Sequence, residues 1–146
     1  MIRPFKTTDL DTVMHIWLSS NTDAHDYIPE TYWISNYDSV KEAIPNADLY
    51  IFEENNQIYG FLGVIDGYIA GLFIRKELRS QGIGHKLLSE AKTHYSKLSL
   101  NVYSRNTKAI RFYEREGFNA VSISIDDNTG EEEMFMEWSL IAPQTL

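Results

Sequence analysis

The chain has 146 residues, a formal net charge of −8 and no cysteine. A net negative charge of this size disfavours general binding to DNA or RNA, which depends on cationic neutralisation of phosphates. Without cysteine the chain can form no disulfide, no thiolate metal site and no cysteinyl-enzyme intermediate.

The N-terminal segment predicts a short strand followed by a helix. Residues 2–4 favour the strand, and Thr8 or Asp9 can cap the helix. The apolar residues of this helix recur at intervals of three and four: Leu10, Val13, Met14, Trp17 and Leu18. We expect the helix to end at residues 19–21, where polar residues follow one another.

A polar loop, residues 21–29, contains His25 and Asp26 and leads to Pro29, which suits the start of a second helix. This helix is expected to continue until Pro45, with a break near residues 35–36. Because the loop and helix are inserted between the first helix and the later strands, we expect them to border a substrate groove.

Three consecutive strands are predicted next, at residues 48–54, 57–65 and 68–74. Asn55-Asn56 joins the first two, and both side chains tolerate the positive φ of a tight hairpin turn. Asp66-Gly67 offers a second turn of the same kind. The three strands should therefore pair antiparallel in chain order.

The most informative segment follows the third of these strands and contains Arg79-Ser80-Gln81-Gly82-Ile83-Gly84. Apolar residues after it line one helix face: Ile83, Leu87, Leu88 and Ala91. Two glycines allow a ligand to approach the backbone closely, and the free N–H groups of a first helical turn attract anions. The segment predicts a phosphate-bearing cofactor, and the alternative is a tight turn without a ligand. Neither the Walker spacing nor the dinucleotide spacing matches.

The C-terminal part predicts a strand at residues 98–102, a helix capped by Asn106 or Thr107, and strands at residues 119–125 and 133–140. The order β-α-α-β-β-β-α-β-α-β-β indicates an α+β domain with one mixed sheet. We expect a single domain over residues 1–140 and a frayed tail over residues 141–146. No apolar run approaches the roughly 18 residues of a membrane helix and the N-terminus does not resemble a signal peptide, so the cytoplasm is the expected compartment.

Two motifs together resemble the signatures of the GNAT N-acetyltransferases. The first is Arg79-x-x-Gly82-x-Gly84 after an apolar strand, and the second is Asn106-x-x-Ala109-x-x-Phe112-Tyr113-x-x-x-Gly117-Phe118. The element order also matches this family over residues 1–140, most closely the small single-domain bacterial members that include protein lysine acetyltransferases. The resemblance implies the GNAT fold, in which about four helices flank a mostly antiparallel sheet.

The resemblance also implies acetyl-CoA as co-substrate and a set of residues that bind it. The pyrophosphate would be bound by backbone N–H groups of Gln81, Gly82, Gly84, His85 and Lys86. The main chain of Leu72 and Ile74 would pair with the pantetheine arm, and Asn106 would bind that arm. The whole set implied for the cofactor is Leu72, Phe73, Ile74, Arg79, Gln81, Gly82, Ile83, Gly84, His85, Lys86, Asn106 and Tyr113.

Acetyl transfer to an amine requires a proton acceptor for the amine and a proton donor for the thiolate. A phenol with a pKa of about 10 stays protonated at neutral pH, so Tyr113 is predicted to be the general acid. His25 is the first choice for the base because an unperturbed imidazole has a pKa of about 6.5. Asp26, Asp66, Tyr68 and Tyr103 remain alternatives.

No metal is expected, because the four histidines show no paired ligand spacing and the acidic residues 131–133 are typical of a solvated turn. The predicted function is direct transfer of acetyl from acetyl-CoA, in a ternary complex, to a primary amine of a protein lysine, a peptide N-terminus or a small molecule. No nucleic acid or membrane partner is expected, and the protein would be a monomer or homodimer. The alternative is a catalytically silent acyl-CoA-binding regulatory module.

Overall fold

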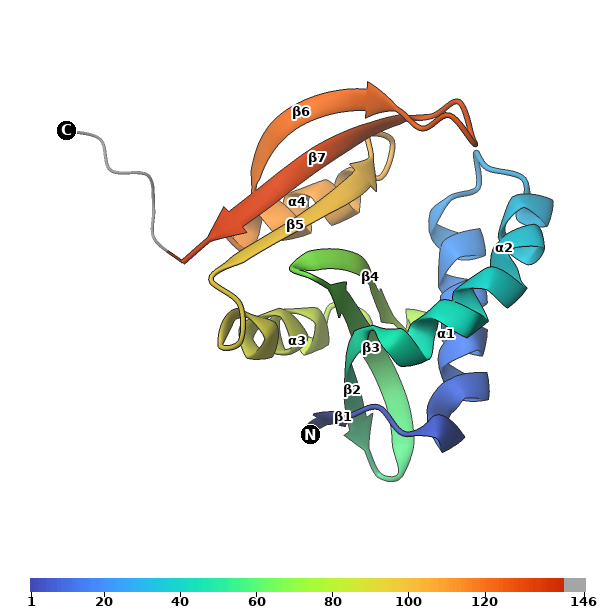
Figure 1. Ribbon diagram of the computed structural model, residues 1–146, viewed down its shortest axis with the longest axis vertical. Coiled ribbons are helices and arrows are strands. Elements are labelled where there is room, and N and C mark those ends of the chain that lie inside the picture. The colour runs from blue at the N-terminus through green and yellow to red at the C-terminus, as the bar shows by residue number, and fades with distance from the viewer. Residues whose placement is uncertain (141–146) are drawn as a thin grey trace.

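The computed structural model describes residues 1–140, so the predicted tail lies outside the described residues. Seven strands form one sheet in the order β1-β2-β3-β4-β5-β7-β6, and four α-helices flank it (Figure 1). The elements are β1 Ile2–Pro4, α1 Leu10–Ala24, α2 Glu30–Ala43, β2 Asp48–Glu54, β3 Gln57–Ile65, β4 Tyr68–Ile74, α3 Ile83–Lys92, β5 Lys97–Tyr103, α4 Thr107–Arg115, β6 Asn119–Ile125 and β7 Glu132–Ser139. The predicted α+β class is confirmed. Within this range no helix combines the length and apolarity needed to cross a membrane.

The hairpin turns form where the sequence predicts them. Asn55 and Asn56 have φ values of 53° and 61°, and Asp66 and Gly67 have values of 50° and 79°. Positive φ at both central residues matches the right-handed twist of the paired strands. β2, β3 and β4 therefore pair antiparallel in chain order.

Two expectations about the first helices are wrong. α1 continues to Ala24 rather than ending at residues 19–21, because the buried Asn21 amide donates to the Trp17 carbonyl at 3.0 Å and so is satisfied inside the helix. α2 has no break near residues 35–36, since the Asn36 amide donates to the Tyr32 carbonyl at 2.7 Å in the same way. Polar side chains that normally end helices are here bonded back to the preceding turn.

Helices cover both faces of the sheet, with α1 and α2 on one side and α3 and α4 on the other (Figure 1). One apolar cluster includes Leu87 of α3 and Leu62 of β3, and the other includes Met14 of α1 and Ile51 of β2. β4 contributes to both because its side chains alternate: Leu72 packs against the first cluster and Phe73 against the second.

The sheet opens between β4 and β5, its parallel pair. Among residues 1–140 this pair has one registered position, Tyr68 opposite Ser99, whereas β5 and β7 pair along the full length of β5. Beyond Tyr68 the two strands diverge. The backbone groups along the facing edges are therefore left free to bond with something other than a neighbouring strand.

Candidate active site

The diverging strands open onto a cavity of about 1250 Å³. It extends from the loop between β4 and α3 to the loop between α1 and α2, and α4 forms one of its walls. Such a volume exceeds the usual range for small-ligand pockets, so it can hold a long cofactor together with part of an acceptor.

At one end the glycine loop presents an anion-binding turn. Gly82 has a φ of +82° and is the N-cap of α3, and the first helical bond runs from the Lys86 N–H to the Gly82 carbonyl at 3.1 Å. The N–H groups of residues 83–85 come before this first bond and have no partner within the helix, so they are available to an anion. A Cβ on Gly84 would lie 3.1 Å from Phe112 Cζ, so a larger residue would crowd this cradle. The loop therefore fits a phosphate.

Polar side-chain contacts hold this loop from two sides. Arg79 Nη1 lies 2.9 Å from Asp23 Oδ2 and Lys76 Nζ lies 3.2 Å from Asp23 Oδ1, which ties the loop to the end of α1. Hydrogen bonds from Arg79 and Lys76 lower the pKa of the Asp23 carboxyl. On the other side, His85 Nδ1 lies 2.8 Å from Glu116, just after α4.

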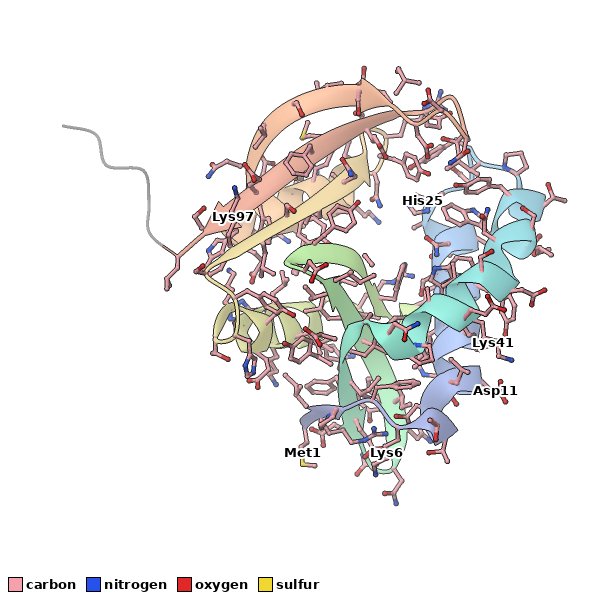
Figure 2. The ribbon with its side chains drawn as sticks, in the orientation of Figure 1. Met1, Lys6, Asp11, His25, Lys41 and Lys97 are labelled. Carbon is pink, nitrogen blue, oxygen red and sulfur yellow. The ribbon has the colours of Figure 1, made fainter. Side chains whose placement is uncertain are left out.

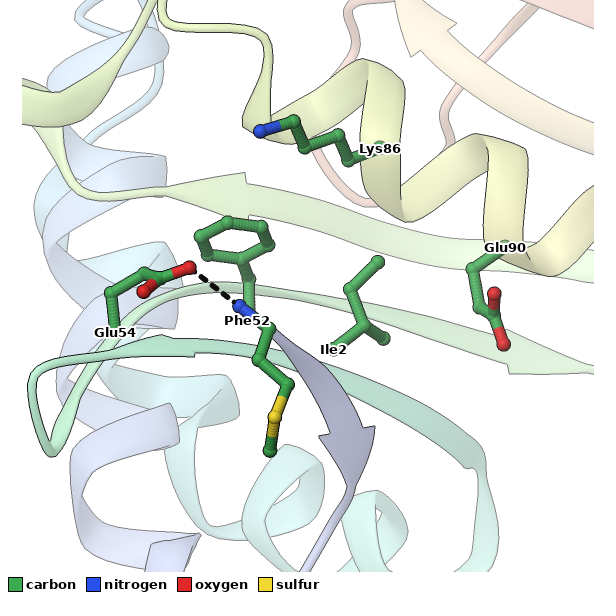
Figure 3. Close-up of a pocket in the computed structure, with 6 residues that line it drawn as sticks. Ile2, Phe52, Glu54, Lys86 and Glu90 are labelled. Carbon is green, nitrogen blue, oxygen red and sulfur yellow. Dashed lines mark hydrogen bonds and ion pairs between the residues drawn. The ribbon is translucent and has the colours of Figure 1, made fainter.

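Most of the residues predicted to bind the cofactor line this cavity, whereas Gln81 and Lys86 do not. The Lys86 ammonium lies 5.7 Å from the Phe52 ring centre and faces a separate cavity of about 450 Å³ (Figure 3). The predicted residues along the large cavity are Leu72, Phe73, Ile74, Arg79, Gly82, Ile83, Gly84, His85, Asn106 and Tyr113.

Tyr113, on α4, faces the cavity with its side chain 8% exposed. Its ring packs edge-on against Phe112 and Phe118, with centroid separations of 5.3 and 5.5 Å. Burial raises the pKa of the phenol, so the hydroxyl keeps its proton throughout the neutral range.

His25 lies at the opposite end, just after α1 (Figure 2). Its ring stacks on Trp33 at 5.3 Å and meets Tyr103 edge-on at 5.1 Å. Nε2 lies 3.5 Å from the amide nitrogen of Asn106, and the buried Nδ1 has no hydrogen-bond partner among residues 1–140. Burial lowers the pKa of His25 below its ordinary value of 6.5, so the ring is neutral at pH 7 and can accept a proton.

The fold adds residues that sequence analysis did not single out. Trp33 and Tyr27 line the cavity beside His25, and Glu133 on β7 lies opposite Tyr103 on β5. Burial, followed by the nearby charge of Asp126, raises the pKa of the Glu133 carboxyl. The acidic residues 131–133 are therefore more than a solvated turn. Only the register of two strands distant in sequence could reveal this.

The other suggested bases are placed differently. Asp26, Tyr68 and Tyr103 line the cavity, and Asp66 does not. The Tyr103 hydroxyl donates to Asp126 Oδ2 at 2.9 Å, while the Tyr68 hydroxyl accepts from Asn101 at 2.9 Å. Within the part of the chain that the structure describes, no group of three or more carboxylate or imidazole residues is arranged to hold a metal ion.

Comparison with known proteins agrees with this geometry. The family model described as "Acetyltransferase (GNAT) domain" matches residues 23–139. The chain is 31% identical to peptidyl-lysine N-acetyltransferase YiaC of Escherichia coli K12, over all of both chains. It is 28% identical to peptidyl-lysine N-acetyltransferase YjaB of the same organism over 89% of each chain.

Solved structures share the fold. The solution structure of apo-form YjaB from Escherichia coli superposes with a TM-score of 0.83 at 26% identity, over 94% of this chain and 96% of that one. A crystal structure from Bacillus anthracis, determined in complex with acetyl coenzyme A, superposes with a TM-score of 0.59 at 24% identity, over 64% and 62% of the two chains.

The family model and the named relatives identify an acyltransferase that depends on acetyl-CoA, and the anion-binding loop and the diverging strands fit that class. The chain belongs to the GNAT family of acetyltransferases. The predicted family, fold, enzyme class and co-substrate are thereby confirmed.

Proposed function

We propose that the protein transfers acetyl directly from acetyl-CoA to the primary amine of a protein lysine. The observation that carries the proposal is a single cavity with a neutral imidazole, His25, at one end of α4 and a protonated phenol, Tyr113, further along it. Direct transfer is accelerated by a proton acceptor and a proton donor in one site. The names of the relatives, peptidyl-lysine N-acetyltransferases, favour lysine over other amines.

Each group has a defined role in this proposal. When bound, acetyl-CoA supplies a thioester-activated acetyl group. His25 accepts a proton from the acceptor ammonium, whose pKa is about 10.4, and so exposes the nitrogen lone pair. The N–H of Ile74 polarises the carbonyl, because in the register with β3 the N–H groups of its neighbours, Phe73 and Arg75, point towards β3. As the new C–N bond forms and the C–S bond breaks, Tyr113 gives its proton to sulfur and regains one from the nitrogen. The proton on His25 passes to solvent.

The chemistry around His25 supports a cationic acceptor. Asp26 and Glu133 line this end of the cavity, and neither forms an ion pair with another residue in the range 1–140. The rings of Trp33 and Tyr103 form an apolar surface next to them, whereas the Tyr27 ring is already covered by the Arg105 guanidinium, 5.2 Å from its centre and paired with Glu131. An aliphatic chain ending in an ammonium group satisfies both features, since rings and carboxylates each attract a cation.

Finer parts of the proposal remain predictions. They are the ternary complex, the cytoplasmic location, the monomeric or homodimeric state, and the lack of nucleic-acid and membrane partners. A catalytically silent regulatory module is not favoured, because the chain belongs to a family of acetyltransferases and both proton-transferring groups face the cavity.

The test is thiol release from acetyl-CoA with a panel of acceptors: a lysine peptide blocked at its N-terminus, a peptide with only a free N-terminus, and a polyamine. Activity with the blocked lysine peptide supports the proposal. Tyr113→Phe should then lower kcat by roughly 100-fold or more and leave the KM for acetyl-CoA near its original value, as expected for a general acid. Acetyl-CoA binding without release on any acceptor would exclude the proposed reaction.

A further inference from the structure

Three cations lie along the cavity face of α4. Lys108, Arg111 and Arg115 follow one another at intervals of three and four residues, which places them on one side of the helix over a rise of about 10 Å. All three are exposed and line the large cavity. We call these residues the α4 cation row.

The positions of these three cations are not all explained by interactions within the helix or with carboxylates. Arg111 and Arg115 are a like-charge pair at i and i+4, which destabilises an isolated helix. Lys108 lies in the first turn, where the helix dipole disfavours a cation. No carboxylate among residues 1–140 forms an ion pair with any member of the row, although the chain as a whole carries a charge of −8. The dipole favours a cation at Arg115, in the last turn, but helix stability does not account for Lys108 or for the like-charge pair, whereas an anionic ligand would.

The row ends beside the anion-binding loop. Phe112, between the two arginines, lies 3.1 Å from the Cβ position of Gly84, and Glu116, next to Arg115, is paired with His85. The opposite, N-terminal end of α4 lies next to His25, because its N-cap residue, Asn106, contacts the His25 ring. Arg111 and Arg115 therefore lie towards the phosphate-binding end, and Lys108 lies towards the acceptor end.

The cations of the loop itself are already engaged. Arg79 and Lys76 both pair with Asp23, so much of their charge is offset on that side. The free N–H groups at the start of α3 suit one anionic group, the pyrophosphate. Coenzyme A carries a second, the 3′-phosphate on the adenosine ribose, with a charge between about −1.5 and −2 at neutral pH, by analogy with other phosphate monoesters. Cations that are not already paired with a carboxylate would attract it more strongly than Arg79 and Lys76 do.

We propose that Arg111 and Arg115 form a subsite for the 3′-phosphate of acetyl-CoA. A guanidinium fork binds phosphate oxygens in pairs, and two forks on adjacent turns can share the three terminal oxygens of a monoester. This subsite selects coenzyme A over its 3′-dephospho form. The inference rests on acetyl-CoA dependence alone and is independent of the acceptor.

The test is calorimetric titration with coenzyme A and with 3′-dephospho-coenzyme A, which differ only in this group. Wild type should bind coenzyme A about tenfold more tightly, as charge-assisted hydrogen bonds predict. The double variant Arg111→Gln/Arg115→Gln should bind both ligands with equal Kd, close to the wild-type Kd for the dephospho form. The single variants should show intermediate preferences.

The control is Lys41→Gln/Lys97→Gln, which changes the net charge by the same amount. Neither lysine lines the cavity, and Figure 2 shows both on the outer surface. This control should keep the wild-type preference, and ligand-free melting of each variant checks folding. Equal binding of both ligands by wild type overturns the inference. So does a double variant whose affinities for the two ligands fall by the same factor, because the preference for coenzyme A would then be unchanged. Failure of wild type to bind either ligand would instead contradict acetyl-CoA dependence.

Discussion

Burial at single residues sets the protonation states on which the proposed chemistry depends. Removing charge-stabilising water lowers the pKa of His25 and raises that of Tyr113. At neutral pH His25 is therefore unprotonated and can accept a proton, while Tyr113 is protonated and can donate one. The same environment makes Tyr113 a weaker acid, so its proton moves most readily when negative charge develops on sulfur. The pKa shifts also make stability depend on pH.

The His25→Gln variant tests this linkage. Because the folded-state pKa of His25 lies below 6.5, the unfolded chain binds more protons just below that pH, and the folded state loses stability as the pH falls through it. Gln removes this contribution, so urea unfolding at pH 7.5 and pH 5.5 should differ less in the variant than in wild type. His15→Gln, at an exposed position of α1, is the control and should keep the wild-type difference. An unchanged difference in His25→Gln contradicts the prediction.

A buried ion pair makes Asp9 important for stability. Its carboxylate accepts two bonds from Arg3, at 2.8 and 2.9 Å, and one from the Lys6 N–H at 2.8 Å. Asp9→Asn should cost about 3 kcal/mol because it leaves Arg3 partly unpaired. The melting temperature should fall by roughly 10 °C. Asp11→Asn breaks only an exposed contact to Lys41 and should cost less than about 0.5 kcal/mol (Figure 2). Similar losses in the two variants would show that burial is not the cause.

At the scale of elements, a strand, a turn and a helix build the phosphate cradle. β4 delivers the chain to the cavity, Gly82 turns it through a left-handed conformation, and α3 begins with its free N–H groups directed at the ligand. An ion pair with Asp23 of α1 and a hydrogen bond between His85 and Glu116, just after α4, hold the loop in place. Backbone geometry, rather than any one side chain, is therefore expected to dominate binding of the pyrophosphate.

Gly82→Ala and Gly130→Ala form a matched pair for this idea. Both glycines have positive φ, 82° and 74°, and neither Cβ position has an atom within 4 Å. Each variant should lose about 1–2 kcal/mol of stability from backbone strain. Only Gly82 lines the cavity, so only Gly82→Ala should weaken acetyl-CoA binding, by about tenfold, because a Cβ there hinders close approach of the phosphate. Calorimetric titration of both variants with acetyl-CoA tests this prediction. Equal affinities of the two variants for acetyl-CoA would count against phosphate binding by the glycine loop.

For the whole molecule, the decisive feature is a sheet that is left incomplete. Antiparallel pairing holds β1 to β4 together and β5 to β7 together, while β4 and β5 meet at one registered position among residues 1–140. The helices on both faces keep the two parts in place around the opening. A ligand with amide groups can therefore complete the hydrogen bonding that the strands leave unmade.

Hydrogen exchange can detect this completion. Acetyl-CoA should slow amide exchange in residues 70–74 of β4 and 100–103 of β5, which face the opening. Exchange in β3, which is paired on both sides, should change much less and provides the internal control. Adenosine 3′,5′-bisphosphate, which lacks the pantetheine arm, should leave amide exchange in these residues of β4 and β5 at the ligand-free rate. Equal protection by both ligands would argue against pairing with the arm.

Local sequence signals determined much of the fold. The strands of residues 48–54, 57–65 and 68–74 match the prediction to the residue, because Asn55-Asn56 and Asp66-Gly67 specify tight turns through their own backbone preferences. The glycine loop was recognisable for the same reason. Both signals lie within a few consecutive residues, so no knowledge of distant contacts was needed.

Tertiary structure decided what depends on contacts between distant segments. The end of α1 was mispredicted because burial of Asn21 outweighs its tendency to end a helix. His25 lies next to Asn106, 81 positions away, and Glu133 faces the cavity only through the register of β5 and β7. Solvent exclusion, which shifts the pKa values of these groups, exists only after the chain has folded. The sequence alone thus specified the family and the cofactor loop, and packing determined the protonation states of the groups in the site.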